Sequence, residues 1–256
     1  MVYIRHKGGG RMGSDISTMD KIWSAEWLTI DPQKALAGCE KEDTWYWIQQ
    51  YMKPPMRILE GGCGVGQWVR FLAERGYEAY GLDFSQEAIR VGMEAWSDLR
   101  LIQGDLRSMP YEDGYFGGIV SLGAIEHDEK GPQAILREMR RVLAPGGILF
   151  CTVPCINYLR RSGLSVLFDW VVCNPTIRRL TGRKPDVAFY EYMWTPREYR
   201  RILQDAGFEV LRLVPMSPLL SVKGRPGSLR RRLVEWVHAR VPWLMCHMTG
   251  AFCRKA

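Results

Sequence analysis

MRILEGGCGVGQWVRFLAERG, residues 56–76, is the stretch of this sequence that determines the fold. Its first residues are typical of a short buried strand, and the glycine-rich segment after them opens a helix that runs to about Arg75. Gly76 ends that helix as a C-terminal cap does. Successive glycines between a strand and a helix let the backbone turn tightly and approach a ligand with no Cβ in the way. The stretch therefore predicts a strand, a ligand-binding loop and a helix.

Strands and helices alternate from this stretch onward. The predicted strands are 56–61, 78–83, 99–103, 117–122 and 147–153, and the predicted helices after the first are 85–96, with Ser85 as N-cap, and 132–143. The pattern resumes with a helix from Thr195 to Ala206, a strand over 208–215 and a last strand over 245–253. Repeated strand–helix units form a parallel sheet covered on both faces. The predicted fold class is α/β and Rossmann-like.

Two acidic residues follow neighbouring strands of the predicted sheet. Asp83 comes 17 residues after Gly66 and is expected beside the glycine-rich loop, where a carboxylate can accept hydrogen bonds from both hydroxyls of a ribose. Asp105, one strand further on, can accept a hydrogen bond from an adenine amino group. Together they predict a slot for an adenosine. The alternative is that both are only capping or turn residues.

A nicotinamide-cofactor oxidoreductase is the first competing class, because it uses a similar sheet. That class needs the spacing Gly-x-Gly-x-x-Gly, and its third glycine would fall at position 67, which is Gln67. The glycine pattern thus disfavours this class.

The ordered motifs resemble the class I S-adenosylmethionine-dependent methyltransferases, and within them the small-molecule group (type 11) that includes quinone-biosynthesis enzymes. The motifs that carry the resemblance are Ile58–Gly66, Gly81–Ser85, Gly104–Leu106, Ser121–His127 and Leu136–Gly147. They cover about residues 56–154, with a weaker similarity over 194–210. Five motifs in the right order are specific for cofactor and fold, but they indicate little about the acceptor.

The resemblance implies a sheet of seven mostly parallel strands with the last strand antiparallel, helices on both faces and a helical lid or insertion. It implies S-adenosyl-L-methionine as cofactor, S-adenosyl-L-homocysteine as product and no metal. The residues expected to bind the cofactor are Glu60 (methionine amino group), Gly61, Gly62, Gly64 and Gly66 (loop), Asp83 (ribose), Phe84 (adenine cover), Asp105 and Leu106 (adenine edge), and Leu122 and Gly123 (below the sulfonium). One departure is Gly61, where the family usually has a branched apolar residue, so the strand end is expected to be looser.

Methyl transfer from a sulfonium mainly requires that donor and acceptor are held in line and water is excluded. If the acceptor is a hydroxyl, a nearby base assists by taking its proton, and His127 is the candidate. O-, C- and N-methylation all stay open. The predicted acceptor is a small molecule or lipid intermediate; an RNA methyltransferase and a non-catalytic protein that binds the cofactor are the alternatives.

The chain is expected to divide into an N-terminal arm with lid helices (1–55) and a methyltransferase domain (56–256) with insertions at 155–193 and 216–244. Within the first part, residues 1–18 are expected to be a mobile arm, followed by helices over 19–28 and 40–52 that carry several tryptophans and tyrosines. The first insertion is rich in aromatic residues and arginines, which suits a ring or an anionic acceptor.

Charge is distributed unevenly over the 256 residues, whose net charge is +7. Residues 1–156 carry 17 Lys and Arg against 21 Asp and Glu, a balance of −4, and residues 157–256 carry 18 against 7, a balance of +11. A predicted helix over 228–241 has an apolar side and four arginines, so it suits the surface of an anionic membrane, although packing onto the protein is the alternative. Nucleic acid is not expected as a partner, because no RNA-binding module is recognisable in the sequence. The oligomeric state stays open.

The longest apolar stretch, 164–173, is about ten residues long and falls short of the roughly 20 that span a bilayer. The N-terminus lacks the apolar core of a secretory signal. The seven cysteines contain no Cys-x-x-Cys pair, so we expect them to be reduced and packed in the protein. The expected location is the cytoplasm, with peripheral contact at the inner membrane surface as a further expectation.

Overall fold

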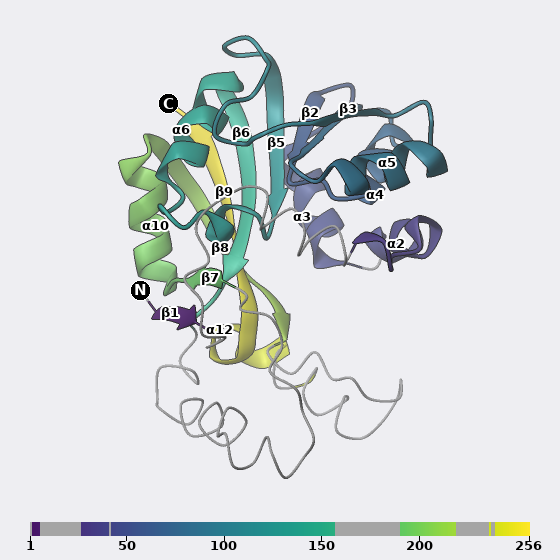
Figure 1. Ribbon diagram of the computed structural model, residues 1–256. Coiled ribbons are helices and arrows are strands. Elements are labelled where there is room, and N and C mark those ends of the chain that lie inside the picture. Colours follow the sequence, from purple (N-terminus) through teal and green to yellow (C-terminus); the bar gives the residue numbers. More distant parts are fainter. Residues whose placement is uncertain (1, 6–26, 41, 157–189, 219–235, 237–238) are drawn as a thin grey trace.

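A seven-stranded sheet forms the centre of the molecule in the computed structural model, which describes residues 2–5, 27–40, 42–156, 190–218, 236 and 239–256 (Figure 1). The strand order is β4-β3-β2-β5-β6-β9-β8. The strands are β2 (Arg57–Gly61), β3 (Glu78–Asp83), β4 (Arg100–Gln103), β5 (Phe116–Leu122), β6 (Leu143–Pro154), β8 (Phe208–Pro218) and β9 (Cys246–Lys255). Neighbours from β4 to β6 are parallel, whereas β9 is antiparallel to both β6 and β8. The predicted sheet, with its last strand reversed, is confirmed.

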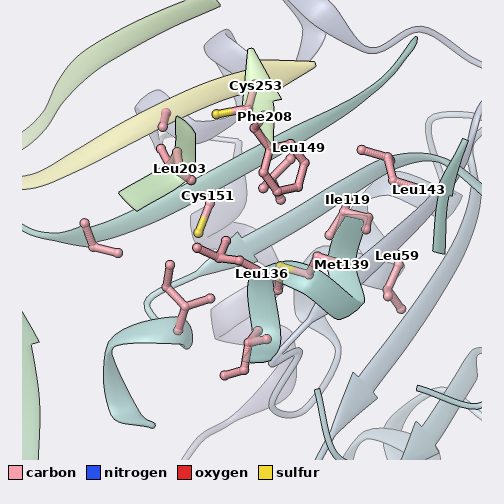
Figure 2. Close-up of a cluster of buried hydrophobic side chains, with 14 of the residues drawn as sticks. Leu59, Ile119, Leu136, Met139, Leu143, Leu149, Cys151, Leu203, Phe208 and Cys253 are labelled. Atoms are coloured by element: carbon pink, nitrogen blue, oxygen red, sulfur yellow. The ribbon is translucent and has the colours of Figure 1, made fainter. Parts of the chain in front are cut away.

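Helices cover both faces of this sheet. They are α2 (Pro32–Cys39), α3 (Asp43–Tyr51), α4 (Gln67–Ala73), α5 (Gln86–Ala95), α6 (Gln133–Val142), α10 (Pro196–Asp205) and α12 (Pro242–Met245), with a short 3-10 helix, η1, at Ile125–His127. Side chains of α6 and α10 belong to one buried cluster, and those of α3 and α4 belong to another on the opposite face. Figure 2 shows Leu136 and Met139 from α6 beside Ile119 from β5 in the first cluster.

Two helix starts agree with their sequence signals. The Ser85 side chain accepts a hydrogen bond from the Ala88 N–H at the start of α5. At the start of α10, the Thr195 hydroxyl accepts from the Glu198 N–H while the Glu198 carboxylate accepts from the Thr195 N–H. This reciprocal pair is a capping box, which satisfies two of the backbone donors that a helix start leaves free.

The N-terminal region differs from the prediction. Residues Val2–Arg5 form a strand, β1, which pairs antiparallel with β7 (Tyr190–Met193), so the prediction of a mobile arm is wrong for these four residues. A helix that was not predicted, α2, precedes α3, and the Asp31 carboxylate caps it. The predicted helix over 40–52 is confirmed as α3, whereas the one over 19–28 lies almost wholly outside the described residues.

The two predicted insertions are described only at their ends. The first contributes β7, and most of its aromatic residues and arginines lie outside the described residues. The second begins later than predicted, because β8 continues to Pro218. Most of the predicted helix over 228–241 also lies outside the described residues. The division of the chain at residue 55 stays a prediction. The six described cysteines are buried, and none of these six is in a disulfide.

Candidate functional site

The glycine-rich loop joins β2 to α4 at the edge of the sheet where the parallel strands end. Gly62, Gly64 and Gly66 have φ angles of +80°, +53° and +78°, a region that disfavours residues with a Cβ. The Gly62 N–H donates to the Leu82 carbonyl of β3 at 2.8 Å, which holds the loop against the neighbouring strand. Gly66 is the N-cap of α4 and supplies no capping side chain. The first N–H groups of α4 thus lie next to a glycine-rich loop, an arrangement that favours a polar ligand.

Asp83, the last residue of β3, holds the glycine-rich loop in place. Its carboxylate accepts hydrogen bonds from the Gly64 N–H at 2.8 Å and from the Ser85 N–H at 2.9 Å. The residue is only 4 % exposed. The prediction that Asp83 lies beside the loop is confirmed. Its two hydrogen bonds also give Asp83 the structural role of a turn residue, which was the alternative. A carboxylate has about four acceptor positions, so accepting from these two N–H groups is compatible with also accepting from a ligand hydroxyl. The ribose contact stays a prediction.

Asp105 follows β4, the strand next to β3, at the same edge of the sheet. The Gly104 N–H donates to the Asp83 carbonyl at 2.8 Å, which brings the two strand ends together. The Arg107 guanidinium donates to both carboxylate oxygens of Asp105, and the Arg107 backbone N–H donates to one of them. Burial acts to raise the pKa of Asp105, but the bonds and charge of Arg107 outweigh it and lower that pKa below its ordinary value. Asp105 is therefore a paired turn residue, and its adenine contact stays a prediction.

Glu60 lies in β2 directly before the loop and is buried, with 2 % of its surface exposed. Its Oε2 has no hydrogen-bond partner within the described residues, and neither has the buried Oε1 of Gln67 at the start of α4. Burial raises the pKa of Glu60 well above its ordinary value, and the charge of Asp83 adds to this effect. Buried polar atoms are usually paired. Two unpaired acceptors on either side of the loop fit the cationic amino group of S-adenosylmethionine.

The space beside Gly61 is filled by a neighbouring side chain, so the expected loosening of the strand end is wrong. Gly61 pairs with Leu82 in the parallel ladder. A Cβ at Gly61 would come 2.9 Å from Cδ2 of Leu106 and 3.3 Å from Cε of Met139. Because Gly61 has no side chain, Leu106 can pack against the end of β2, which explains the departure from the family pattern.

The remaining predicted residues lie at the same edge. Phe84 follows β3 and is half-buried, and its carbonyl accepts from the Gln103 side chain at 3.1 Å. Leu122 ends β5, and Gly123 follows with φ +71°. His127, at the end of η1, is half-buried. The structure therefore brings all the predicted site residues to the ends of four parallel strands, the location where such sheets bind ligands.

Comparison with known proteins agrees with this geometry. Residues 59–151 match the family model described as a methyltransferase domain. Two curated relatives are demethylmenaquinone methyltransferases. The one from Staphylococcus carnosus is 28 % identical in an alignment 187 residues long, which covers 64 % of this chain and 74 % of the relative. The one from Staphylococcus aureus (strain JH9) is 27 % identical in an alignment 173 residues long, which covers 59 % of this chain and 67 % of the relative. This chain is an S-adenosylmethionine-dependent methyltransferase.

Solved structures show the same fold at low sequence identity. A methyltransferase from Methanosarcina mazei aligns with a TM-score of 0.60 and 21 % identity, over 82 % of this chain and 96 % of that one. A Haloferax volcanii chain, from the complex between the Trm112 methyltransferase activator and a methyltransferase, aligns with a TM-score of 0.64 and 17 % identity, over 91 % of this chain and 97 % of that one. At these low identities, the similarity is evidence for the fold and not for the substrate or the partners.

Two further properties of the described residues concern metal-binding groups and membrane-spanning helices. They contain no group of three or more His, Cys, Asp or Glu side chains that is suited to a metal ion. Among the helices that they form, none is long and apolar enough to cross a bilayer.

Glu126 is a buried carboxyl group in the methyltransferase that the sequence did not single out for a chemical role. It lies in η1 and is 1 % exposed, and its Oε2 has no partner within the described residues. Burial raises its pKa to about 8, and the negative charge of Glu191 adds to the effect. The group is thus neutral at neutral pH, which makes it unsuited to act as a base there.

This raised pKa predicts that stability depends on pH. The unfolded chain ionises Glu126 near pH 4.5 and the folded chain near pH 8, so the folded state binds more protons between these values. The free energy of unfolding should therefore fall as pH rises through this window. Glu126→Gln should flatten that dependence in urea unfolding at pH 5, 6.5 and 8, and Glu129→Gln, an exposed neighbour, should retain it. If the free energy of unfolding changed equally with pH in the wild type and in Glu126→Gln, the raised pKa of Glu126 would be contradicted.

Proposed function

We propose that this methyltransferase transfers a methyl group to a small, apolar, ring-containing acceptor of the lipid-intermediate class. The observation that carries the proposal is its similarity to demethylmenaquinone methyltransferases over more than half of the chain. Apolar side chains near the end of β5 support it. Leu122 is half-buried there, and Cε of Met248 from β9 lies 3.9 Å from where a Cβ at Gly123 would stand.

Bound S-adenosylmethionine would supply an electrophilic methyl group, and the residues of the chain would hold the reactants and exclude water. Glu60 and Gln67 offer acceptors for the methionine amino group. Asp83 holds the loop and accepts from the ribose hydroxyls. Gly123, with no side chain, lets the acceptor approach the end of β5.

The test of the proposed function follows radioactive methyl groups from S-adenosylmethionine. The purified protein is incubated with three fractions of cell extract: extracted lipids, RNA and small polar metabolites. Label in a quinone-like lipid supports the proposal. Label in RNA would overturn it in favour of the RNA alternative, and label in polar metabolites would overturn the lipid class. Cofactor binding without any labelled product would indicate a non-catalytic protein.

His127 is proposed as the base that takes the proton of a hydroxyl acceptor. Proton abstraction by a positioned side chain contributes about 100-fold or more to the rate. His127→Asn should therefore lower kcat about 100-fold, while the affinity for S-adenosylhomocysteine stays unchanged. Steady-state kinetics and calorimetric titration measure the two effects. A folded variant that keeps the wild-type kcat would exclude His127 as the base.

Membrane contact is proposed for the segment before β9. Trp236, Val241 and Leu244 are 54 %, 45 % and 38 % exposed, and the Arg240 guanidinium lies 4.0 Å from the Trp236 ring centre. The helix α12 leads directly into β9, which runs antiparallel to β6, so α12 lies at the edge where the parallel strands end (Figure 1). In the sequence, residues 219–245 carry six Lys and Arg and one Glu.

These features fit peripheral contact with an anionic membrane, at the cytoplasmic face. Tryptophan favours the membrane–water interface, and basic residues are attracted to anionic lipids. A lipid acceptor would then reach the edge of the sheet that holds the site directly from the bilayer.

Sedimentation with vesicles tests this contact. The wild type should bind vesicles of phosphatidylcholine with phosphatidylglycerol, and less so at high salt, because salt screens the attraction. The double variant Trp236→Ala, Val241→Ser should bind several-fold more weakly. Tyr46→Ala, which removes an aromatic side chain that is 56 % exposed on α3, is the matched control and should bind as the wild type does. Equal binding of all three proteins would exclude this surface.

A further inference from the structure

Trp27 covers the glycine-rich loop. A Cβ at Gly64 would come 2.7 Å from Cζ2 and Cζ3 of Trp27 and closer still to Cη2. The far edge of the indole therefore rests on the loop where the loop has no side chain. The same Gly64 donates its N–H to Asp83, so Trp27 contacts a loop residue that is bonded directly to the predicted ribose-binding residue.

The segment that carries Trp27 is anchored to the helix that follows the loop. The Ile30 N–H donates to the Trp27 carbonyl at 3.2 Å, and Asp31 then caps α2. The helix α2 packs against α4 and ends at Cys39, which is completely buried. The position of the indole over the loop is thus set by a packed helix a few residues away.

The exposure of Trp27 distinguishes it from the tryptophans of the core. Trp68, Trp96 and Trp194 are 3 %, 7 % and 2 % exposed, whereas Trp27 is only partly buried. A tryptophan that served the core alone would be expected to pack between a helix and the sheet. Trp27 instead lies against the loop at Gly64, a residue that is expected to bind the cofactor.

We propose that Trp27 is a cofactor-contacting residue, which packs its indole against bound S-adenosylmethionine and closes the slot over Gly64. The cofactor carries a positive sulfonium, and the face of an indole attracts a cation most strongly where water is excluded. The ring also supplies a large apolar surface at low cost in side-chain entropy. The inference rests on the cofactor and is independent of the proposed acceptor.

The test is calorimetric titration of the full chain with S-adenosylmethionine and with S-adenosylhomocysteine. Trp27→Ala should weaken the binding of S-adenosylmethionine by about ten-fold, the loss expected for one aromatic contact, and that of S-adenosylhomocysteine by less, because the latter lacks the positive sulfonium. Trp27→Phe, which keeps an aromatic ring, should weaken it less than about three-fold. The matched control is Tyr46→Ala, which removes an aromatic side chain on α3 that is 56 % exposed, and it should bind the cofactor as the wild type does.

Two further readouts separate a cofactor contact from a structural role. Trp27→Ala should raise KM for S-adenosylmethionine more than it lowers kcat, and the change in tryptophan fluorescence on binding S-adenosylhomocysteine should be reduced in Trp27→Phe. Unchanged or tighter cofactor binding by a folded Trp27→Ala would overturn the proposal. A wild type that binds the cofactor but labels no acceptor would overturn the proposed function and leave this inference standing.

Discussion

Asp83→Ala is expected to weaken the binding of S-adenosylhomocysteine by about 100-fold or more, the loss that corresponds to roughly 3 kcal/mol. The carboxylate accepts from the N–H groups of Gly64 and Ser85, and alanine would leave both of these buried donors without their acceptor. Each unpaired buried donor costs about 1–3 kcal/mol. The loop would lose its link to β3, and the ribose would lose its proposed partner.

Calorimetric titration measures this loss, and urea unfolding measures the accompanying loss of stability. The control is Asp98→Ala, because Asp98 precedes β4 at the opposite edge of the sheet, pairs with Arg70 and has a side chain that is 71 % exposed. Exposed ion pairs contribute little to stability, so this variant should resemble the wild type in both measurements. Wild-type affinity in a folded Asp83→Ala would remove Asp83 from the cofactor site.

Gly62→Ala is expected to have the second large effect, a loss of about 2–4 kcal/mol in the free energy of unfolding together with loss of cofactor binding. Gly62 has φ +80°, and a Cβ there would come 2.6 Å from the Cβ of Ala124. The substitution therefore combines backbone strain with a steric clash between two loops at the ends of β2 and β5. Relief of the clash would move the loop that is expected to hold the methionine part of the cofactor.

Gly146→Ala separates these two causes. Gly146 has a similar φ of +72°, but a Cβ there meets nothing within 4 Å. It should therefore cost only the backbone strain, about 1–2 kcal/mol, and leave cofactor affinity unchanged. Urea unfolding and calorimetric titration of the two variants test the comparison. Equal effects of both substitutions on both measurements would show that close approach at Gly62 has no special role.

Much of the central fold follows from local sequence patterns. The strand β3 has the limits predicted for it, 78–83, and α10 begins at Pro196 after the predicted cap Thr195. Such elements are predictable because a period of apolar residues and a capping side chain act over a few neighbouring positions. The order of the motifs then placed Asp83 beside the glycine-rich loop, since parallel strands end at one edge of a sheet.

Elements that depend on distant partners were missed. The strand β1 exists through its pairing with β7, nearly 190 positions away, and its own four residues carry no signal for that pairing. The helix α2 was missed for a different reason. The sequence contains its start signals, the N-cap Asp31 and Pro32, but the helix is short and weakly apolar and lies between two aromatic segments, so its periodicity did not indicate a helix.

The sequence by itself determined the α/β fold, the class of cofactor and the edge of the sheet that carries the site, because these depend on residue types at short spacings. Only the tertiary structure decided that Trp27 rests on Gly64, that Leu106 fills the space beside Gly61 and that Arg107 pairs with Asp105. It also decided that Glu126 is neutral, since burial sets its pKa. Steric fit and desolvation arise between segments that are far apart in the chain, and no local pattern records which of them will meet.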